Sequence, residues 1–304
     1  MAALSMIVLV GDHRGFEVTG GIRTLAKLLQ EQLHKEGSYS CIVTAKHPHP
    51  KGFQKMVVLG CSSPWAYGLV IKTRLLHPKR EIHWIPCFHP PRFVRHRWKA
   101  HLARWALRRL QAIGITVHAL SRSEQVELST GRCNLTSLPF ALHHQPGPSQ
   151  QRIYSLVFLG RPVEQKGWHS FLELVRGLPG RALALVPSAP LEELPDNLDI
   201  KVALEDGQIP NHLRQCRILF IPSDYESFGF AQAQALAQGC CVPVLGEWPL
   251  WIDVPQLDWR GESLDRWRAK ILELLRDENL RQTLVKLQQH SWLLRPERQA
   301  PKRP

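Results

Sequence analysis

Apolar positions along the first half of the chain change repeatedly between two spacings, and the change predicts alternating strands and helices. Short apolar, β-branched runs are typical of buried strands, and they occur at residues 6–10, 40–45, 55–60, 81–88 and 115–121. Residues 21–37 and 96–114 instead have apolar side chains at helical spacing. Strands that alternate with helices in this way predict a parallel sheet with helices on both faces.

The second half repeats the alternation. Its predicted strands are residues 155–160, 182–187, 217–223 and 241–246. Its predicted helices are residues 169–178, 209–216 and 231–239, followed by one continuous helical stretch from about residue 263. Residues 143–152 are rich in Pro, Gly, Ser and Gln, as linkers are. We therefore expect two Rossmann-like, doubly wound α/β domains, 1–147 and 148–304, facing each other across a cleft at the carboxyl ends of both sheets.

Composition is that of a soluble globular protein, with 44% hydrophobic and 21% charged residues. No apolar run approaches the ~20 residues that span a bilayer. The first apolar stretch, SMIVLVG, is too short for a signal peptide and lacks its basic leader. The 7 cysteines form no CxxC pair, which favours free thiols over a disulfide framework or a zinc site. These features together predict a cytoplasmic protein.

Positive charge is concentrated in the first half of the chain. Residues 1–150 contain 20 Lys and Arg against 7 Asp and Glu, whereas residues 151–304 contain 19 of each kind. The whole formal net charge of +13 therefore lies in the first half. This asymmetry indicates an anionic partner there, such as a lipid surface, a phosphorylated saccharide or nucleic acid. The alternative is solubility charge without a partner.

Two stretches of the second half carry candidate chemistry. FLGRPVEQKG (158–167) places Arg161 and Lys166 in one loop after a predicted strand, where two cations suit a diphosphate. DYESFGFAQAQALAQGC (224–240) places Glu226 just before a predicted helix start, and Gly229 would let the backbone approach a ligand there. The plainer alternatives are a turn with ordinary surface cations and a carboxylate that caps a helix.

The combined pattern is more specific than either stretch. GR-x4-KG, then PS-x-x-E-x-FG about sixty residues later, then a helix that ends in G-x-x-V-P-V, resembles the family-four retaining glycosyltransferases of the GT-B fold. The resemblance extends to residues 19–29, 87–93 and 117–128. It implies an N-terminal acceptor-binding domain and a C-terminal domain that binds a nucleotide sugar.

Roles for individual residues follow from the resemblance by position. Arg161 and Lys166 match the pair that holds the donor diphosphate, and Glu226 matches a carboxylate that faces the donor sugar. The residues implied to touch the sugar and phosphate are Ser227, Phe228, Gly229 and Phe230. Gly20 and Gly21 match an N-terminal loop that closes on the diphosphate. His89 matches a catalytic histidine at the mouth of the cleft, although a lone histidine after a strand is often structural.

One position departs from the family pattern. The family usually has a second Glu eight residues after the first, where it binds ribose hydroxyls, and this chain has Gln234 there. An amide keeps a carbonyl acceptor and adds two donors but loses the charge-assisted bond. Residues 185–190 also lack the glycines that are usual in the family. We therefore expect donor binding to persist, with weaker affinity or a different base preference.

The implied reaction transfers a hexose-type sugar from a nucleotide diphosphate to a hydroxyl, with retention at the anomeric carbon. Its main demand is stabilisation of the departing diphosphate, which two cations and a helix start can provide. The chain has no D-x-D triplet, so a metal-bridged diphosphate is not predicted, and no cofactor is expected beside the nucleotide-sugar substrate. The HPHP run (47–50) and the pair His143–His144 are interpreted as surface-loop histidines rather than metal ligands.

The acceptor is predicted to bind the basic half. The helix at residues 96–112 carries two tryptophans, Trp98 and Trp105, among the cations Arg97, Lys99, Arg104, Arg108 and Arg109. Such a helix could lie on an anionic membrane, or its tryptophans could face the domain core. We favour a peripheral bacterial enzyme at the inner face of the membrane that acts on a lipid-linked or phosphorylated saccharide, in lipopolysaccharide or surface-polysaccharide assembly.

Other functions remain open at this point. The same site could act on a soluble small-molecule acceptor. The protein could also be a catalytically weak relative that binds a sugar nucleotide, which the departure at Gln234 would explain. Nucleic-acid binding by the basic half is a hypothesis of a different class, but the sequence contains no recognisable nucleic-acid module.

Overall fold

The chain forms two compact units, residues 1–140 and 141–304. The computed structural model describes residues 6–11, 21–43, 52–61, 63–94, 96–120, 122–128, 133–135, 151–205, 207–246 and 254–293. The predicted domain boundary at residues 147 and 148 lies outside these described residues. We call the two parts unit 1 and unit 2.

Unit 1 contains a parallel sheet of six strands in the order β2-β1-β3-β4-β5-β6. The strands are β1 (Met6–Val10), β2 (Tyr39–Val43), β3 (Lys55–Leu59), β4 (Glu81–Ile85), β5 (Thr116–Ala119) and β6 (Cys133–Leu135). The central strand β1 is buried from Ile7 to Val10. A continuous apolar run of this kind forms where helices cover both faces of a parallel sheet.

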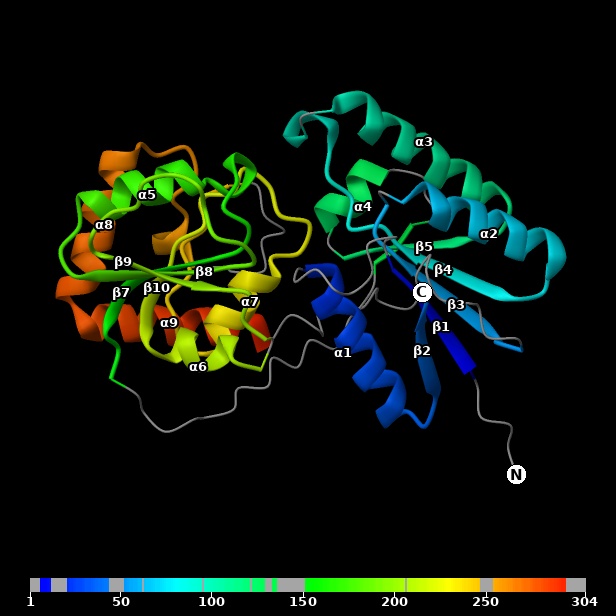
Figure 1. Ribbon diagram of the computed structural model, residues 1–304, viewed down its shortest axis with the longest axis horizontal. Coiled ribbons are helices and arrows are strands. Elements are labelled where there is room, and N and C mark those ends of the chain that lie inside the picture. Colours follow the sequence, from blue (N-terminus) through cyan, green and yellow to red (C-terminus); the bar gives the residue numbers. More distant parts are fainter. Residues whose placement is uncertain are drawn as a thin grey trace. The chain divides into compact units, whose positions relative to one another are not determined.

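The helices of unit 1 lie on both faces of this sheet (Figure 1). They are α1 (Gly21–Lys35), α2 (Pro64–Leu76), α3 (Arg97–Ala112) and α4 (Arg122–Leu128). Figure 1 shows α2, α3 and α4 over one face and α1 on the other. This follows from the strand order, because the chain moves from β1 to β2 in one direction and from β3 to β6 in the other, and right-handed crossovers then place the helices on opposite sides.

Unit 2 repeats the architecture with four parallel strands in the order β10-β7-β8-β9. The strands are β7 (Tyr154–Leu159), β8 (Arg181–Val186), β9 (Leu198–Val202) and β10 (Cys216–Leu219). The helices are α5 (Trp168–Arg176), α6 (Ile209–Arg214), α7 (Phe230–Ala237), α8 (Leu264–Arg276) and α9 (Glu278–Leu293). In Figure 1, α5 and α8 cover one face of the sheet and α6, α7 and α9 the other.

Among the described α-helices and strands, four were not predicted from the sequence: α2, α4, β6 and β9. Helix α2 begins with a proline at its first position and has apolar residues around most of its circumference, so its helical periodicity is weak. Strand β6 has only three residues, too few for a period-2 pattern. Helices α2 and α4 and strand β6 continue the expected α/β alternation, whereas β9 follows β8 without a helix between them, and none of the four changes the fold class.

The prediction of a strand at residues 241–246 is wrong. This segment forms only isolated bridges, Ile218 with Cys241 and Val244 with Asp258. Between them, the side chain of the fully buried Gln288 on α9 takes the place of a neighbouring strand. Its amide donates to Val242 O at 2.6 Å, and its carbonyl accepts from Val242 N at 3.1 Å. A side chain therefore satisfies the backbone that a ladder would have paired.

The prediction of one continuous helix from residue 263 is also wrong, because the chain breaks at Asp277. This residue has an extended backbone, with φ −104° and ψ 92°, and it ends α8. Its carboxylate accepts a hydrogen bond from Leu280 N at 2.9 Å, which caps the start of α9. Aspartate favours helix N-caps over helix interiors, and this preference explains the break.

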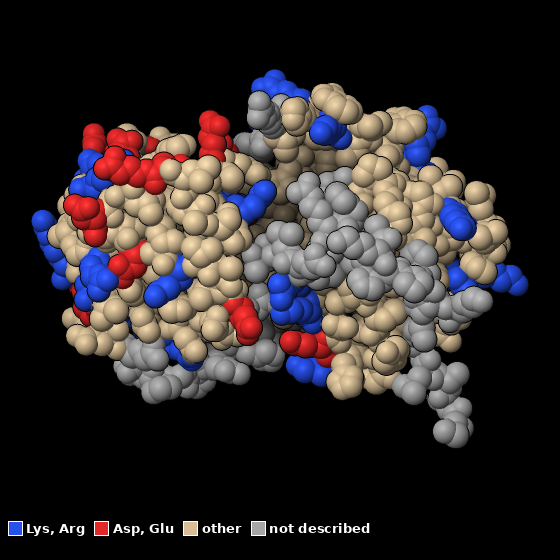
Figure 2. Space-filling model, viewed as in Figure 1, with Lys and Arg blue, Asp and Glu red and all other residues tan. Residues whose placement is uncertain are grey.

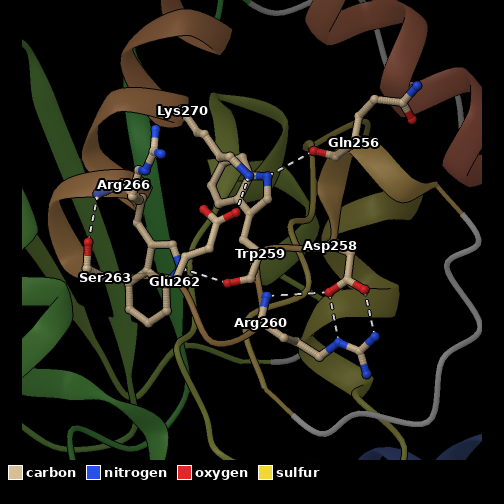
Figure 3. Close-up of polar contacts among 9 residues, drawn as sticks. Gln256, Asp258, Trp259, Arg260, Glu262, Ser263, Arg266 and Lys270 are labelled. Atoms are coloured by element: carbon tan, nitrogen blue, oxygen red, sulfur yellow. Dashed lines mark hydrogen bonds and ion pairs between the residues drawn. The ribbon is translucent and has the colours of Figure 1, made fainter.

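Two tryptophans join α8 to the segment before it, and the first of them, Trp259, is labelled in Figure 3. The buried Trp259 donates its indole N–H to Gln256 O at 2.9 Å, and Trp267 on α8 donates to Trp259 O at 3.0 Å. Lys270 lies over the Trp259 ring and pairs with Glu262 at 2.5 Å. Ser263 caps α8 by accepting from Arg266 N at 3.3 Å. These contacts fix the segment that pairs with Val244.

Candidate functional site

The site in unit 2 lies where the sheet topology opens a crevice. The chain passes from β7 outward to β8 and β9 and then returns to the other side of β7 as β10. Helix α5 follows β7 on one face, and α7 follows β10 on the opposite face (Figure 1). The loops after β7 and β10 therefore separate above a switch point, the usual place for a ligand in an open α/β sheet.

A glycine brings these two loops into contact. Gly167, between the loop after β7 and α5, has a left-handed backbone with φ +66°. A Cβ atom at this position would lie 2.4 Å from Pro222 O and 2.8 Å from Pro222 C, in the loop after β10. Only glycine accommodates both the backbone angle and the approach of a neighbouring carbonyl. The last glycine of the sequence pattern GR-x4-KG, Gly167, is thus required for the packing of these two loops.

Lys166 and Glu226, sixty residues apart in sequence, form an ion pair at this junction. Lys166 Nζ lies 2.5 Å from Glu226 Oε1, and Ser223 Oγ donates to the same oxygen at 2.7 Å. The side chains are only 19% and 11% exposed. A pair this sheltered is weakly screened by salt, and an ammonium with three donors keeps hydrogen-bonding capacity beyond the one carboxylate.

Arg161 lies in the same loop as Lys166 and is exposed. Its guanidinium Nη2 is 3.5 Å from Gln165 Oε1. The loop after β7 therefore presents a sheltered ammonium and, five residues earlier, an exposed guanidinium. Both groups can donate hydrogen bonds to phosphate oxygens.

The loop after β10 leads directly into a helix start. Gly229 has φ +87° and precedes Phe230, the first residue of α7, and as a glycine it has no side chain with which to cap this end. Ser227 and Phe228 are buried, and the Phe228 and Phe230 rings lie 4.8 Å apart. Uncapped N–H groups at a helix N-terminus attract negative charge. The motif residues from Glu226 to Gly229 thus form one short, buried segment that leads into the half-buried Phe230.

Two glutamines of α7 extend the site. Gln234, the position that departs from the family pattern, is half-buried. Gln232 was missed by the sequence analysis. It is 1% exposed, and within the described part of the chain neither its amide nitrogen nor its amide oxygen has a hydrogen-bond partner. Its carbonyl oxygen lies against Gly229, 3.1 Å from where a Cβ would stand. The available signal was its place in the third position of the helix, from which glutamine can reach back to the N-cap.

The remaining predicted residues belong to unit 1. Gly21 is the first residue of α1, and Gly20 lies outside the described residues. His89 follows β4 and is half-buried. The structure thus brings Lys166 together with the segment from Glu226 to Phe230, with Arg161 in the same loop as Lys166. Gly21 and His89 lie on the other unit.

A surface hollow elsewhere in unit 2 has a volume of about 580 Å³ and is lined by Pro255, Asp258, Arg260 and Gly261. Its arginine donates to the Asp258 carboxylate from Nε at 2.8 Å and from Nη2 at 2.6 Å (Figure 3). None of the residues that line the hollow belongs to the sequence motifs, so we place the candidate site at the Lys166–Glu226 junction instead.

The described residues contain no group of three or more His, Cys, Asp or Glu side chains arranged to hold a metal ion. The HPHP run and His143–His144 lie outside them. None of the helices found among the described residues combines the length and the apolar character needed to cross a bilayer. All 7 cysteines are free, as predicted.

Neither a protein-family model nor a curated protein sequence matches the chain. Solved structures do resemble it. Sucrose-phosphate synthase from Thermosynechococcus elongatus superposes with a TM-score of 0.74 at 14% identity, covering 95% of this chain and 94% of that one. WaaG, a glycosyltransferase involved in lipopolysaccharide biosynthesis, superposes with a TM-score of 0.63 at 13% identity, covering 97% of this chain and 98% of that one.

A third structure is that of a variant of S. aureus TarM in complex with UDP, among other ligands. It gives a TM-score of 0.64 at 13% identity and covers 80% of this chain and 53% of that one. At these identities the similarity establishes architecture. The two parallel sheets, each covered by helices on both faces, together with the match over nearly the whole chain, show that this protein has the two-domain Rossmann-like fold of the GT-B glycosyltransferases.

Proposed function

We propose that this protein is a glycosyltransferase that moves a sugar from a nucleotide-diphosphate donor to a hydroxyl group, with retention at the anomeric carbon. The observation that carries the proposal is the sheltered Lys166–Glu226 pair at the switch point of unit 2, beside the loop that leads through Gly229 into the start of α7. A cation and a helix N-terminus at one crevice suit a diphosphate, and the carboxylate beside them suits sugar hydroxyls. The GT-B fold makes this assignment coherent.

In the proposed reaction the bond between the anomeric carbon and the donor phosphate oxygen breaks. The acceptor oxygen bonds to that carbon on the same face, and its proton passes to the departing phosphate oxygen. Lys166, Arg161 and the N–H groups at the start of α7 would stabilise the negative charge that develops on the diphosphate. We propose no metal for this role, because these groups supply the positive charge.

Glu226 is suited to orient the donor sugar because two groups already fix it. Lys166 and Ser223 both contact its Oε1 atom, so the carboxylate loses little freedom when a ligand arrives. We propose that Gln234 hydrogen-bonds the ribose as a neutral group. In unit 1, His89 is proposed to lie near the transferred sugar.

We propose a lipid-linked or phosphorylated saccharide as the acceptor, bound by unit 1 at the inner face of a membrane. Helix α3 supports this proposal. Its side chains Trp98, Leu102 and Trp105 are 62%, 53% and 55% exposed, so the alternative in which the tryptophans face the domain core is wrong. They follow one another at helical spacing along one face of α3, where Lys99 lies over Trp98 and Arg109 over Trp105.

Helix α2 adds to this surface. Ile71, Leu75 and Leu76 are exposed, and neither α2 nor α3 contains an acidic residue. In Figure 2 the surface over these two helices shows Lys and Arg without Asp or Glu, whereas unit 2 shows both signs. Exposed aromatic and aliphatic side chains among cations match an anionic lipid surface. WaaG, whose fold is shared, is a glycosyltransferase of lipopolysaccharide biosynthesis, which favours the same class of acceptor.

The proposal is tested by ligand binding and by transfer. In a thermal-shift screen of nucleotide sugars, a cognate donor should raise the melting temperature, because it binds only the folded state. With that donor, Lys166→Ala and Glu226→Ala should each lower the transfer rate about a hundredfold or more, since each removes a charge from the reacting centre. Lys286→Ala, which removes an exposed lysine of α9, is the matched control and should leave the rate unchanged.

Two outcomes would contradict the proposal. One is a Lys166→Ala protein that transfers sugar at the wild-type rate. The other is a chain that no nucleotide sugar stabilises and that releases no nucleotide with any acceptor. Gln234→Glu, measured beside the wild type, separates an active enzyme from a weak relative, because a gain of a hundredfold or more in rate would identify Gln234 as the cause of low activity.

A further inference from the structure

The segment that carries His89 has a constrained backbone. It follows β4, and Cys87 in it adopts φ +49°, one of two non-glycine residues with positive φ in the described part of the chain. Side chains other than glycine rarely adopt the left-handed region, because their Cβ atom crowds the following carbonyl. Strained backbone persists only where neighbouring groups hold it, and such places often serve function. Two carboxylates of α4 contact residues of this segment and of the short helix after it.

A buried carboxylate provides one attachment. Glu124, in the first turn of α4, is fully buried. Its Oε1 accepts a hydrogen bond from Phe88 N at 2.5 Å, and its Oε2 accepts one from Leu120 N at 2.7 Å. Phe88 stands between the strained Cys87 and His89. Burial raises the pKa of Glu124 to about 7, and the hydrogen bonds from Phe88 N and Leu120 N oppose this effect because they favour the carboxylate.

A second carboxylate of α4 provides the other attachment. Glu127 pairs with Arg92, which lies in the short helix η2 (Pro91–Phe93), and with Arg104 of α3 at 3.2 Å. His89 therefore lies between two points, Phe88 and Arg92, that the same helix holds. We call the pair of bonds made by Glu124 the Glu124 clamp.

Helix capping does not by itself explain the Glu124 clamp. The sequence S-x-x-E at residues 121–124 is a capping-box pattern, in which the glutamate reaches back to the backbone at its own helix start. The bond to Leu120 N lies one residue before the N-cap position and is close to that role. The bond to Phe88 N does not fit it, because Phe88 belongs to the loop after a different strand, 36 residues away.

We propose that Glu124 is a positioning residue, which fixes the backbone of residues 87–89 and thereby the place of His89 in the transfer reaction. The inference rests on the proposed function, in which His89 acts near the transferred sugar. Glu124 contacts no substrate in this scheme. It acts through its hydrogen bond from Phe88 N, which holds the preceding Cys87 in its left-handed conformation. The backbone angles of Cys87 in turn fix where the chain places Phe88 and His89.

The Glu124→Gln variant tests the inference, because glutamine keeps the shape but places an amide N–H against one of the two backbone N–H groups. At pH 8, where Glu124 is ionised, hydrogen exchange at residues 86–93 should become about tenfold faster as one charge-assisted bond is lost. The transfer kcat should fall about tenfold or more, while KM for the donor, which binds unit 2, should stay within about twofold.

Rescue distinguishes positioning from general damage. Glycine adopts the left-handed backbone without strain, so Cys87→Gly in the Glu124→Gln background should restore part of the lost kcat, by about fivefold. Glu31→Gln, on the exposed side of α1, is the control and should change neither exchange nor kcat. If Glu124→Gln does not fold, Glu124→Asp keeps the charge but shortens the reach by one methylene and tests the same bond.

The outcomes separate this inference from the proposed function. Faster exchange with an unchanged kcat in Glu124→Gln overturns the positioning role while the wild type still transfers sugar. Unchanged exchange overturns the Glu124 clamp itself. If the wild type transfers no sugar, the proposed function fails and the positioning role fails with it, whereas faster exchange would then still establish the clamp.

Discussion

At the scale of single residues, the candidate site depends on a few positions where backbone conformation and close contact leave no alternative. Gly167 is the clearest, because the carbonyl of Pro222 occupies the space that a side chain would need. Lys166 precedes it directly. The contact that lets the loops after β7 and β10 touch is therefore also the contact that sets the distance from Lys166 to Glu226.

Gly167→Ala should be destabilising by about 3 kcal/mol. A left-handed alanine costs about 1–2 kcal/mol, and forcing a methyl group against a fixed carbonyl adds about 1–3 kcal/mol. Urea denaturation measures the loss. Gly261→Ala is the matched control, because Gly261 also has a left-handed backbone, with φ +74°, but nothing lies within 4 Å of its Cβ position. It should lose only about 1 kcal/mol. Equal losses at both glycines would show that the Pro222 contact is unimportant.

The sequence predicts some residues of the site but not others. Glu226 and Lys166 were predicted from motif spacing, and their pairing agrees with a shared site. Gln232 was not predicted, because its place in the sequence, between two alanines in a helix of small residues, does not show that it is buried without a partner. Burial depends on which helices pack against α7, and that information is not local.

At the scale of elements, neighbouring strands of unit 1 create a histidine pair. His83 on β4 and His118 on β5 lie with Nδ1 and Nε2 only 2.8 Å apart. Burial lowers the pKa of His83, and nearby Lys55 lowers it further, against a smaller opposing effect of Glu81. Burial, followed by the coulombic effects of His83 and Lys55, lowers the pKa of His118 to about 4. The pair is therefore neutral at pH 7.

This pair predicts acid sensitivity of unit 1. Both histidines have folded pKa values below the ordinary value of 6.5. As the pH falls below 6.5, the unfolded chain therefore binds more protons than the folded chain, and the folded state loses stability. The contribution of the pair is fully present above pH 6.5 and is lost between pH 6.5 and about 4. With allowance for partial exposure of His118, the loss is about 1–2 kcal/mol. Urea denaturation at several pH values measures it.

His118→Gln isolates the effect, since glutamine can hydrogen-bond His83 but does not titrate. The difference in unfolding free energy between the variant and the wild type should shrink as the pH falls toward 4. A difference that is constant with pH would exclude the pair as a source of acid sensitivity.

Element prediction failed where side chains of distant segments replace local patterns. Residues 241–246 read as a strand, but Gln288 on α9 satisfies the backbone of Val242 in place of a neighbouring strand. The break at Asp277 could have been found, because aspartate at this position has the chemistry of an N-cap. The contact of Gln288 with Val242 is visible only in the tertiary structure, whereas the helix break follows from the residue type of Asp277.

At the scale of the whole molecule, charge separates the two halves. The formal net charge of +13 lies in residues 1–150, and the exposed aromatic face of α3 lies in the same half. Long-range attraction by the basic half and short-range insertion of aromatic side chains would act together at a membrane. These two contributions respond differently to salt, so they can be measured separately.

The protein should bind vesicles that contain anionic lipid, and binding should weaken as salt rises. Arg108→Gln with Arg109→Gln should reduce the salt-dependent part, about 1 kcal/mol for each charge removed. Trp98→Ala with Trp105→Ala should reduce the part that persists in high salt. Leu191→Ala removes a fully exposed apolar residue of unit 2 and is the control. Equal binding to neutral vesicles, or none to either kind, would contradict membrane docking.

The sequence by itself determined the α/β alternation, the two-part organisation and the motif residues that the unit 2 site is built from. These properties are encoded locally, in hydrophobic periodicity and in short patterns with glycine at fixed places. Tertiary structure alone decided that Lys166 meets Glu226, that the tryptophans of α3 face solvent and that Glu124 reaches a loop 36 residues away. Each depends on which segments pack together, and burial is a property of the folded chain rather than of any stretch within it.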